Sequence, residues 1–422
     1  MNKNKIYSIL SLMLMAFSLV GTSCRQEESP SIDDFPLNYD IAPVKLTKSA
    51  KVGALYTNNP FANNNAAESQ YARLLMPYDA TSDPSNPSLG PWVRPVLQRY
   101  NVDYREPATV DLFQQHIDWA KQAGIDFFIM QNVGYDANQP NSLNANSLNN
   151  FNFYEGLSDI SQGKIDWKGL QFCLRAEPSG IVTGTSNTKF VEDDTDADGN
   201  SANITKLCNY FTGLANRFFR DDSLYYRIDD KPVVVITKPQ DLHCQDPVKV
   251  WGAIRDAVRE AAGCELYLVA VQPQWTPTAR FVNSFASGTF DAFYMDTMYR
   301  DNYPQHQGEK RPVYINENWK YNADWGKKNA NMDFIPSISP AFNYWVGNSQ
   351  QYSFPMENYD ENRFRTMCNV AKMNLSAANM VIIDSFNNWT EVTAIEPTDP
   401  YYGNGYGMKM LEIVKSEFKV NE

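Results

Sequence analysis

Eight short apolar runs recur along this chain from Val52 onward, and each is followed by polar residues and then by a stretch with helical periodicity. The runs are apolar throughout rather than at every second residue, which is typical of parallel strands buried on both faces. The predicted strands are Val52–Thr57, Ile125–Gln131, Leu170–Glu177, Pro232–Thr237, Glu265–Gln272, Phe290–Asp296, Ile335–Ser339 and Asn379–Ser385.

Amphipathic stretches lie between these runs. TVDLFQQHIDWAKQAG ends at Gly124 and DPVKVWGAIRDAVREAAG ends at Gly263, and glycine is a common residue just past the end of a helix. Eight repeats of strand and helix predict an α/β fold, the (β/α)8 or TIM barrel, formed by residues 48–422 as one domain. Asparagine-rich segments after the first two strands are expected as loop insertions on the C-terminal face, where they could contact glycans or simply vary.

The first 47 residues have a different character. A short basic region precedes an apolar stretch from Ile6 to Val20, and small residues lead up to Cys24. We interpret residues 1–23 as a signal peptide whose removal leaves Cys24 lipidated; an ordinary signal peptide is the alternative. Residues 24–47 are expected to form an acidic, flexible tether. Acidic residues just after the cysteine resemble the surface-export signal of Bacteroidetes lipoproteins, which implies a lipid-anchored, surface-exposed protein of the outer membrane.

Composition narrows the expected partners. The formal net charge is −12, and the sequence has no basic patch with interleaved aromatic residues, so nucleic acid is not expected as a partner. An acidic, aromatic-rich chain suits neutral polyhydroxy ligands, because sugars stack on rings and hydrogen-bond to carboxylates. The five cysteines after Cys24 are scattered and odd in number, which indicates neither a disulfide framework nor a zinc site.

One segment has the spacing of a metal-binding loop. DTDADGN places Asp194, Asp196 and Asp198 as in a calcium loop. The twelfth position of that loop is Thr205 rather than a glutamate, which argues against an EF-hand. A structural calcium site and a solvated acidic loop both stay open.

Carboxylates follow several of the predicted strands. Glu177 ends the third strand, Asp296 ends the sixth, and Glu391 and Glu396 follow the eighth. In a barrel, residues at these strand ends line the active site. Glycosidic cleavage needs one acid to protonate the leaving oxygen and another to act as base or nucleophile, so Glu177 and Glu391 are catalytic candidates, and Asp296 and Glu396 are candidates for substrate binding. Structural hydrogen bonding is the alternative role for each.

Several aromatic side chains near the same strand ends are candidates for sugar binding. Trp92 and Trp275 are loop tryptophans bracketed by prolines and are predicted as stacking platforms. Tyr344 and Trp345 follow the seventh strand and are similar candidates. His243 follows the fourth strand and could face the cleft.

Four motifs resemble one group of carbohydrate-active proteins. FNNWTEVTAIEP followed by YYGNGYGMKMLEIVK resembles the strand-eight signature of glycoside hydrolase family 99 and the related WbsX-like and family 71 proteins. LRAEPSG is similar to the strand-three Glu-Pro of that family, and VDLFQQHIDWAKQAGIDFFIM is similar to its first helix and second strand. The histidine in the latter, His116, is interpreted as structural. The resemblance covers most of residues 50–418 and implies (β/α)8 enzymes that cut inside α-mannosidic chains with retention.

The resemblance also implies roles for individual residues. Glu391 matches the acid/base that protonates the leaving group, and Trp389 and Glu396 match the family pattern. Asn388 stands where the family has a glutamate that takes a proton from the sugar 2-hydroxyl, and an amide has no useful basicity. Val392 replaces a family glycine.

Three explanations of Asn388 stay open. Another carboxylate, Glu177 or Asp384, could supply the base. The chain could instead follow the family 71 pattern, with a different substrate and mechanism, as in an α-glucanase. Catalysis could also be lost and glycan binding kept, with Asn388 and Trp389 as binding residues.

We therefore expect a surface lipoprotein that hydrolyses an α-linked polysaccharide, with endo action on an α-mannan-type glycan as the leading hypothesis. A catalytically impaired glycan-binding lipoprotein is the main alternative, and glycosyl transfer is a weaker one. The expected partners are the polysaccharide and the lipid anchor's membrane, and the protein is expected to be a monomer. Hydrolysis of this kind needs no cofactor, which leaves calcium as a structural candidate only.

Overall fold

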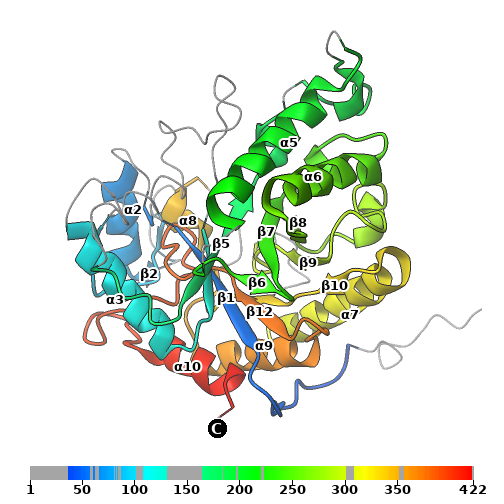
Figure 1. Cartoon of the computed structure of the whole chain (residues 1–422). Helices are drawn as coiled ribbons and strands as arrows, with labels where there is room; N and C mark the ends of the chain where they lie inside the picture. The colour runs from blue at the N-terminus through cyan, green and yellow to red at the C-terminus, as the bar shows by residue number, and fades with distance from the viewer. Residues whose placement is uncertain are drawn as a thin grey trace, which may run out of the picture. The chain divides into compact units, whose positions relative to one another are not determined.

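The computed structural model describes residues 37–420, apart from residues 58–59, 62–65, 80, 82, 84–86, 101–107, 131–163, 183, 196–197, 220–222, 301–307 and 351–355. The chain divides into residues 1–40 and 41–422, and the second unit is described here (Figure 1). The predicted signal peptide, Cys24 and most of the predicted tether lie outside the described residues. The tether's last residues lie in the second unit, where Val44 N donates to Asn369 Oδ1 at 2.9 Å.

A parallel sheet forms the centre of this unit. Its strand order is β10-β9-β8-β7-β5-β4-β1-β12-β11, and every neighbouring pair is parallel. The strands are β1 (Lys51–Tyr56), β4 (Phe127–Met130), β5 (Gln171–Ala176), β7 (Lys231–Thr237), β8 (Tyr267–Gln272), β9 (Ala292–Met295), β10 (Asp333–Phe334), β11 (Ser337–Ile338) and β12 (Met380–Ile383). Most strand residues are buried on both faces, which explains their continuous apolar sequence.

One extended segment joins the two ends of this sheet. β10 pairs with β9, β11 pairs with β12, and Ile335 and Pro336 lie between them. Ile335 N donates to Phe293 O at 2.9 Å, and Ile382 N donates to Pro336 O at 2.9 Å. Residues 333–338 therefore act as one strand bonded on both sides, and they close a ring of eight strands. This confirms the predicted (β/α)8 barrel, and all eight predicted strands occur where the sequence placed them.

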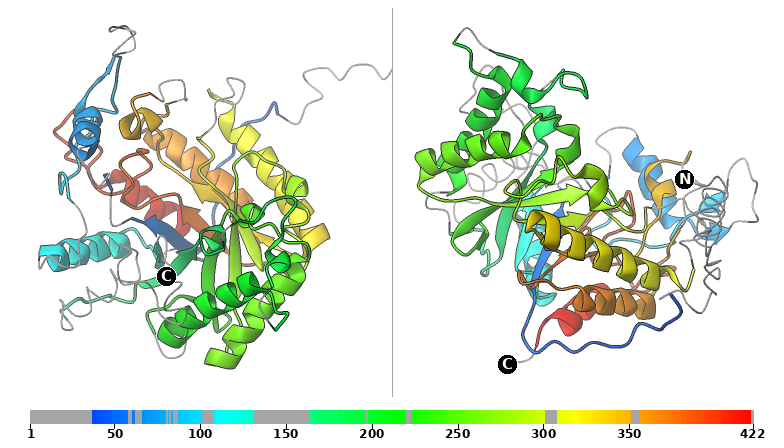
Figure 2. Two further views of the ribbon diagram at one scale, coloured as in Figure 1. Left: turned by 90° about the horizontal axis from the view of Figure 1, so that it is seen from above. Right: turned by 90° about the vertical axis from the view of Figure 1, so that its right-hand side faces the viewer.

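Helices pack around the outside of the sheet (Figure 2). Neighbouring pairs are α5 with α6, α7 with α9, α9 with α10, and α10 with α3. Short strands β2 (Tyr78–Asp79) and β3 (Ser88–Leu89) form a separate hairpin, and β6 (Arg227–Ile228) pairs with β7. The helices are α2 (Ala66–Leu75), α3 (Ala108–Gln122), α5 (Ala202–Leu214), α6 (Pro247–Ala262), α7 (Arg311–Ala330), α8 (Tyr344–Gly347), α9 (Glu361–Met373) and α10 (Lys409–Phe418).

The ends of the helices follow from their sequence. Gly124 after α3 and Gly263 after α6 have φ values of 72° and 68°, the left-handed conformation that glycine adopts most easily. α6 begins where Asp246 Oδ1 accepts a hydrogen bond from Lys249 N at 3.0 Å. The asparagine-rich segment after β1 contains the start of α2, whereas the one after the second strand lies outside the described residues.

Aromatic side chains fill the space between β1, α3 and the chain after β12. The Tyr56 ring lies 5.5 Å from Phe113, 4.8 Å from Phe128 and 6.2 Å from Phe386, measured between centroids. Its hydroxyl shares a hydrogen bond of 2.9 Å with Nδ1 of His116, which is fully buried. This confirms that His116 is a structural residue. Among the described helices, none is both long and apolar enough to cross a membrane.

Candidate active site

Three carboxylates and two arginines lie together where the strands end. Asp296 follows β9 directly, Asp384 follows β12, and Glu391 lies in the loop after β12. Arg175 is the fifth residue of β5, and Arg300 lies in the segment after Asp296. Because the strands are parallel, residues past their C-terminal ends gather at one face of the barrel, although β9 and β12 are far apart in the sequence.

The guanidinium of Arg300 joins two of the carboxylates. Its Nη2 donates to Glu391 Oε1, and its Nη1 lies 3.4 Å from Asp296 Oδ2. The guanidinium also lies over the ring of Tyr344, 5.6 Å from the centroid. The side chains of Glu391 and Arg300 are 18% and 29% exposed, so the pair is largely removed from water but still accessible from one side.

Asn388 holds the second oxygen of Glu391. Its Nδ2 donates to Glu391 Oε2 at 3.2 Å, and its Oδ1 accepts from Thr390 Oγ1 at 2.7 Å. The turn is fixed by Ser385, whose Oγ accepts from Asn388 N at 2.5 Å. Asn388 therefore orients Glu391 as a hydrogen-bond donor, a role that an ionised glutamate in its place could not fill.

Burial governs the protonation of Glu391. It raises the pKa of Glu391 because the charged form loses water, and the neighbouring Asp296 raises it further. Arg300 opposes both effects by stabilising the charged carboxylate. The net direction is upward, which favours a protonated Glu391 at a higher pH than an exposed glutamate.

Asp384 is more strongly affected. Burial raises its pKa well above the usual range, and Asp296 and Glu391 add to this rise. Its Oδ2 is buried and has no hydrogen-bond partner within the described part of the chain. Asp384 and Glu391 thus form a coupled group of carboxyls that holds a proton more tightly than separate surface carboxyls do.

Glu177 has a different environment. Lys238 Nζ donates to its Oε1 at 3.0 Å, and its side chain is 34% exposed. By contrast, the neighbouring charges that raise the pKa of Asp384 are those of Asp296 and Glu391. Of the two carboxylates considered as the base, Asp384 is therefore the one that the structure couples to Glu391.

Glu396 and Trp389 lie beneath the site rather than in it. Both side chains are fully buried, and Trp389 Nε1 donates to Glu396 Oε2 at 2.9 Å. Tyr100 donates to the same oxygen at 2.6 Å, and His116 Nε2 lies 3.6 Å from the other. A buried side chain does not contact a polysaccharide, so the prediction that these two residues bind substrate is corrected: they support the Glu391 loop from below.

Tyr344 and Trp345 are separated by burial. Tyr344 lies under Arg300 and stacks on Phe342, with 6.1 Å between the centroids. Trp345 is only 4% exposed and packs in a small apolar cluster below the loop, with Arg73 over its ring. The prediction that Trp345 binds sugar is therefore also corrected, because its ring packs in the interior and does not face the solvent.

The remaining predicted binding residues lie further around the rim. Trp275, half-buried, donates from Nε1 to Met298 O at 2.9 Å, two residues before Arg300. Trp92 is 42% exposed and lies against Gly403, away from the contacts of Glu391 described above. His243 is half-buried, and its carbonyl accepts from Val191 N at 2.8 Å.

The predicted calcium loop is described only in part. Asp196 lies outside the described residues, and the backbone carbonyl of Asp194 accepts from Ala202 N at 2.6 Å at the start of α5. The described residues contain no group of three or more His, Cys, Asp or Glu side chains arranged to hold a metal. The calcium hypothesis therefore stays a prediction.

Val392 has an unusual backbone for a branched residue. Its φ is 59°, and its side chain is fully buried. This is the left-handed region, which β-branched residues rarely adopt because Cβ approaches the backbone closely. The position that the resemblance assigns to glycine is thus one where glycine is the residue of lowest strain, and Val392 keeps the conformation at a cost.

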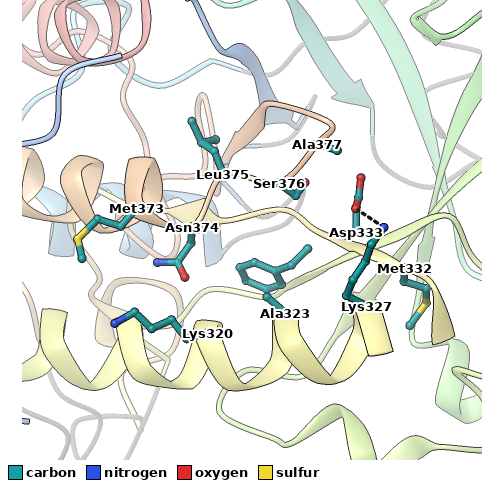
Figure 3. Close-up of a pocket in the computed structure, with 11 residues that line it drawn as sticks. Lys320, Ala323, Lys327, Met332, Asp333, Met373, Asn374, Leu375, Ser376 and Ala377 are labelled. Carbon is teal, nitrogen blue, oxygen red and sulfur yellow. Dashed lines mark ion pairs between the residues drawn. The ribbon is translucent and has the colours of Figure 1, made fainter. Parts of the chain in front are cut away.

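Two cavities lie at opposite ends of the strands. A cavity of about 270 Å³ opens beside the carboxylates and is lined by Arg175, Thr237, Lys238, Gln240, Asp241, Val271, Gln272, Pro273, Gln274 and Asp296. A larger one of about 410 Å³ lies between α7 and the chain after α9, next to Asp333 at the start of β10 (Figure 3). Its lining includes Lys320, Lys327 and Asn374 but none of the carboxylates at the other end. The smaller cavity is therefore the one that belongs to the candidate active site.

Sequence reasoning missed the two arginines. Arg300 could have been found as a basic residue four positions after Asp296, and Arg175 as a charged residue within an otherwise apolar strand. Neither signal says which carboxylate the arginine meets, because that depends on packing between strands.

Comparison with known proteins gives the chain a family and a fold. Residues 198–410 match the model of the family described as glycosyltransferase WbsX. A solved "glycoside hydrolase-like protein" is 26% identical, with a TM-score of 0.71 over 92% of this chain and 99% of the other. The GH99 endo-alpha-mannosidase from Bacteroides thetaiotaomicron is 16% identical, with TM-scores of 0.54 and 0.51 in two structures that each cover 88% of this chain. They span 97% and 98% of that enzyme, and no curated protein matched the sequence.

Proposed function

The chain belongs to the family described as glycosyltransferase WbsX, and we propose that it is a glycoside hydrolase that cleaves an α-linked polysaccharide. One observation carries the proposal: Glu391 is a largely buried carboxyl with a raised pKa, held by Arg300 and Asn388 at the open end of the barrel. A general acid that protonates a glycosidic oxygen must keep its proton at the working pH, must be held in a fixed orientation, and must be accessible to the substrate.

The second proton transfer is assigned to Asp384. Its Oδ2 has no partner among the described residues, and its titration is coupled to Asp296 and Glu391. In its ionised form Asp384 is a strong base for a carboxylate, because its pKa is raised; it can take the proton of water or of a sugar hydroxyl while Glu391 gives its own proton to the leaving oxygen. Asn388 remains a donor that orients Glu391.

The proposed substrate is an α-mannan-type glycan that is cut internally. Support comes from the resemblance of the loop after β12 to family 99 and from the fold shared with a solved GH99 endo-alpha-mannosidase. The matched "glycoside hydrolase-like protein" covers nearly the whole of both chains, which supports hydrolysis rather than the transfer named in the family description.

The test is the release of reducing ends by the purified protein from a panel of α-mannans and α-glucans. Glu391→Gln keeps the size of the side chain and removes the acid, and Glu412→Gln, on the exposed face of α10, is the matched control. We expect release from at least one polymer, its loss in Glu391→Gln and its retention in Glu412→Gln. Products of mixed length would indicate endo action. Release that survives Glu391→Gln would contradict the assignment.

Asn388 supports a second candidate function, glycan binding without cleavage. The amide cannot act as the base that the family glutamate supplies, whereas Trp389 and Glu396, which match the family pattern, still support the loop from below. In the same panel this function would appear as polymer binding, measured by affinity electrophoresis, with no release by the wild-type protein.

We also propose that the protein is anchored to the outer membrane through lipidated Cys24. The apolar stretch followed by small residues and a cysteine supports this. Incorporation of labelled palmitate into the full chain, and its loss in Cys24→Ala, is the expected result. Labelling that persists in Cys24→Ala would contradict it.

A further inference from the structure

The lining of the cavity beside the carboxylates includes a cation that has no ion pair among the described residues. Arg175 extends from β5 into the lining of this cavity, and its Nε is buried with no hydrogen-bond partner among the described residues. A guanidinium removed from water is costly unless a carboxylate or another acceptor pairs with it. An arginine that lines a cavity without such a partner is therefore prepared for an acceptor that arrives with a ligand.

The other cations near the cavity are already paired. Lys238 Nζ donates to Glu177 at 3.0 Å, and Arg300 is shared between Glu391 and Asp296. The acidic residues in the lining do not compensate Arg175 by contact: Asp296 is held by Arg300, and Asp241 is exposed on the turn that follows β7. Among the described cations that line this cavity or lie beside it, Arg175 is thus the one without a paired carboxylate.

The rest of the lining suits the hydroxyls of a sugar. Gln240 has a buried Oε1 without a partner among the described residues, which can accept a hydrogen bond from a hydroxyl. Arg175 is also close enough to Glu391 to affect its charge. A sugar in this cavity would therefore lie next to the candidate acid, at the bond to be cleaved or one sugar away.

We propose that this cavity binds an acidic sugar residue of the substrate, with Arg175 pairing with its carboxylate or sulfate group. The planar fork of a guanidinium matches the two oxygens of either group, and such charge-assisted pairs are stronger than neutral hydrogen bonds. The inference rests on the proposed function, because it assumes that the polymer cleaved at Glu391 occupies the adjacent cavity. The substrate class is then an α-linked polysaccharide that contains uronic acid or sulfated sugars.

The test is calorimetric binding of three α-linked trisaccharides to the Glu391→Gln protein, which cannot consume them by the proposed reaction. Trigalacturonate, its carboxyl-reduced form and a sulfated form of the reduced trisaccharide share one backbone and differ in whether the sugars carry carboxylate, hydroxyl or sulfate groups. We expect at least one charged form to bind about tenfold or more tightly than the neutral form, as for a hydrogen bond to a charged group. The preferred form tells whether carboxylate or sulfate is recognised.

Variants locate the effect. Arg175→Gln is expected to remove the preference for the charged form, and Arg175→Lys to keep part of it. The matched control is Lys328→Gln, which removes an exposed positive charge near the end of α7 and is expected to change nothing. Equal weakening of the binding of the charged trisaccharide in Arg175→Gln and Lys328→Gln would overturn the proposal. Equal binding of charged and neutral trisaccharides by the Glu391→Gln protein would also overturn it, and this second result does not depend on whether an Arg175 variant folds.

The outcomes separate this inference from the proposed function. Cleavage of neutral polymers with no effect of charge on binding would keep the hydrolase and overturn the acidic-sugar site. Binding that depends on charge and on Arg175, in a protein whose wild-type form releases nothing from any polymer, would support the acidic-sugar site and overturn the hydrolase.

Discussion

Arg300 donates a hydrogen bond from Nη2 to Oε1 of Glu391, and these two residues follow different strands, β9 and β12. The pair places the candidate acid under two opposing influences. Burial and Asp296 raise the pKa of Glu391, and Arg300 lowers it. The protonation of Glu391 is therefore set by a residue 91 positions away in the sequence.

Replacement of this arginine should change the pH dependence of cleavage. Without Arg300, only the smaller effect of Arg175 opposes that of burial, so the pKa of Glu391 rises further. A general acid works while protonated, so activity should persist to higher pH in Arg300→Gln. The measurement is kcat/KM against pH, with Arg94→Gln, which removes an exposed arginine paired with Asp399, as the control. An alkaline limb that stays in place or moves to lower pH would contradict this.

Glu391→Gln should slow cleavage most where the leaving group most needs a proton. We expect a loss of about 10²- to 10⁴-fold on a polysaccharide, the usual contribution of a general acid. On an aryl glycoside with an acidic phenol the loss should be much smaller, because that group leaves without protonation. The measurement is the rate of cleavage of both substrates by the wild-type and Glu391→Gln proteins. An equal loss of rate on the two substrates would indicate that Glu391 has a role other than proton donation.

Asn388→Glu should reveal whether a missing base limits the reaction. Nδ2 of Asn388 lies 3.2 Å from Glu391 Oε2, so a glutamate here brings a second carboxylate to the acid, as in the family pattern. Because Asp384 is proposed as the base and Asn388 as the donor that orients Glu391, we expect no rise in kcat in the Asn388→Glu protein. Asn388→Gln is the control, since it has the same length without a basic group. A kcat at least about 10²-fold above this control would show that a missing base limits the reaction and that Asp384 does not supply it.

Asp384 should make stability depend on pH. Its pKa is raised by burial, so the folded protein binds more protons than the unfolded chain once the pH exceeds the unfolded value of about 3.9. This contribution to stability is therefore complete at low pH and is lost as pH rises through the folded pKa. Asp384→Asn cannot ionise and should lose less stability over the same interval. The Tm of both proteins between pH 4 and pH 8 checks this, and parallel curves would contradict it.

At Val392, substitution by glycine should destabilise the protein no more than substitution by alanine, whereas glycine is usually the more destabilising of the two at a buried position. Val392→Ala removes about two buried methyl groups, roughly 1.6 kcal/mol, and leaves a Cβ in the left-handed region. Val392→Gly removes one more carbon but relieves about 1–2 kcal/mol of strain. We expect the free energy of unfolding to fall no more in the glycine variant than in the alanine variant. Denaturant titration of both measures this, and a clearly less stable glycine variant would show that packing outweighs strain.

Local sequence patterns were sufficient for the barrel. The eight apolar runs became eight strands, and Gly124 and Gly263 follow helices, because strand burial and helix termination depend on residues close together in the chain. The position of Glu391 after the last strand follows from the same pattern. The order of strands around a closed barrel then places every C-terminal end on one face, and this is a property of the fold class.

Only the tertiary structure decided which polar groups meet and which are buried. Asn388, Trp389, Glu391 and Glu396 all lie in one short segment after the last strand, and the sequence does not tell which of them are buried. Trp389 and Glu396 lie in the interior with Tyr100 and His116, whereas Asn388 and Glu391 lie at the mouth of the barrel. Arg175 lies in β5 and Arg300 follows β9, both far in the sequence from Glu391, so no local sequence pattern predicts that they lie next to it. Protonation, charge pairing and access depend on distances across the barrel, and those are set by packing between elements far apart in the chain.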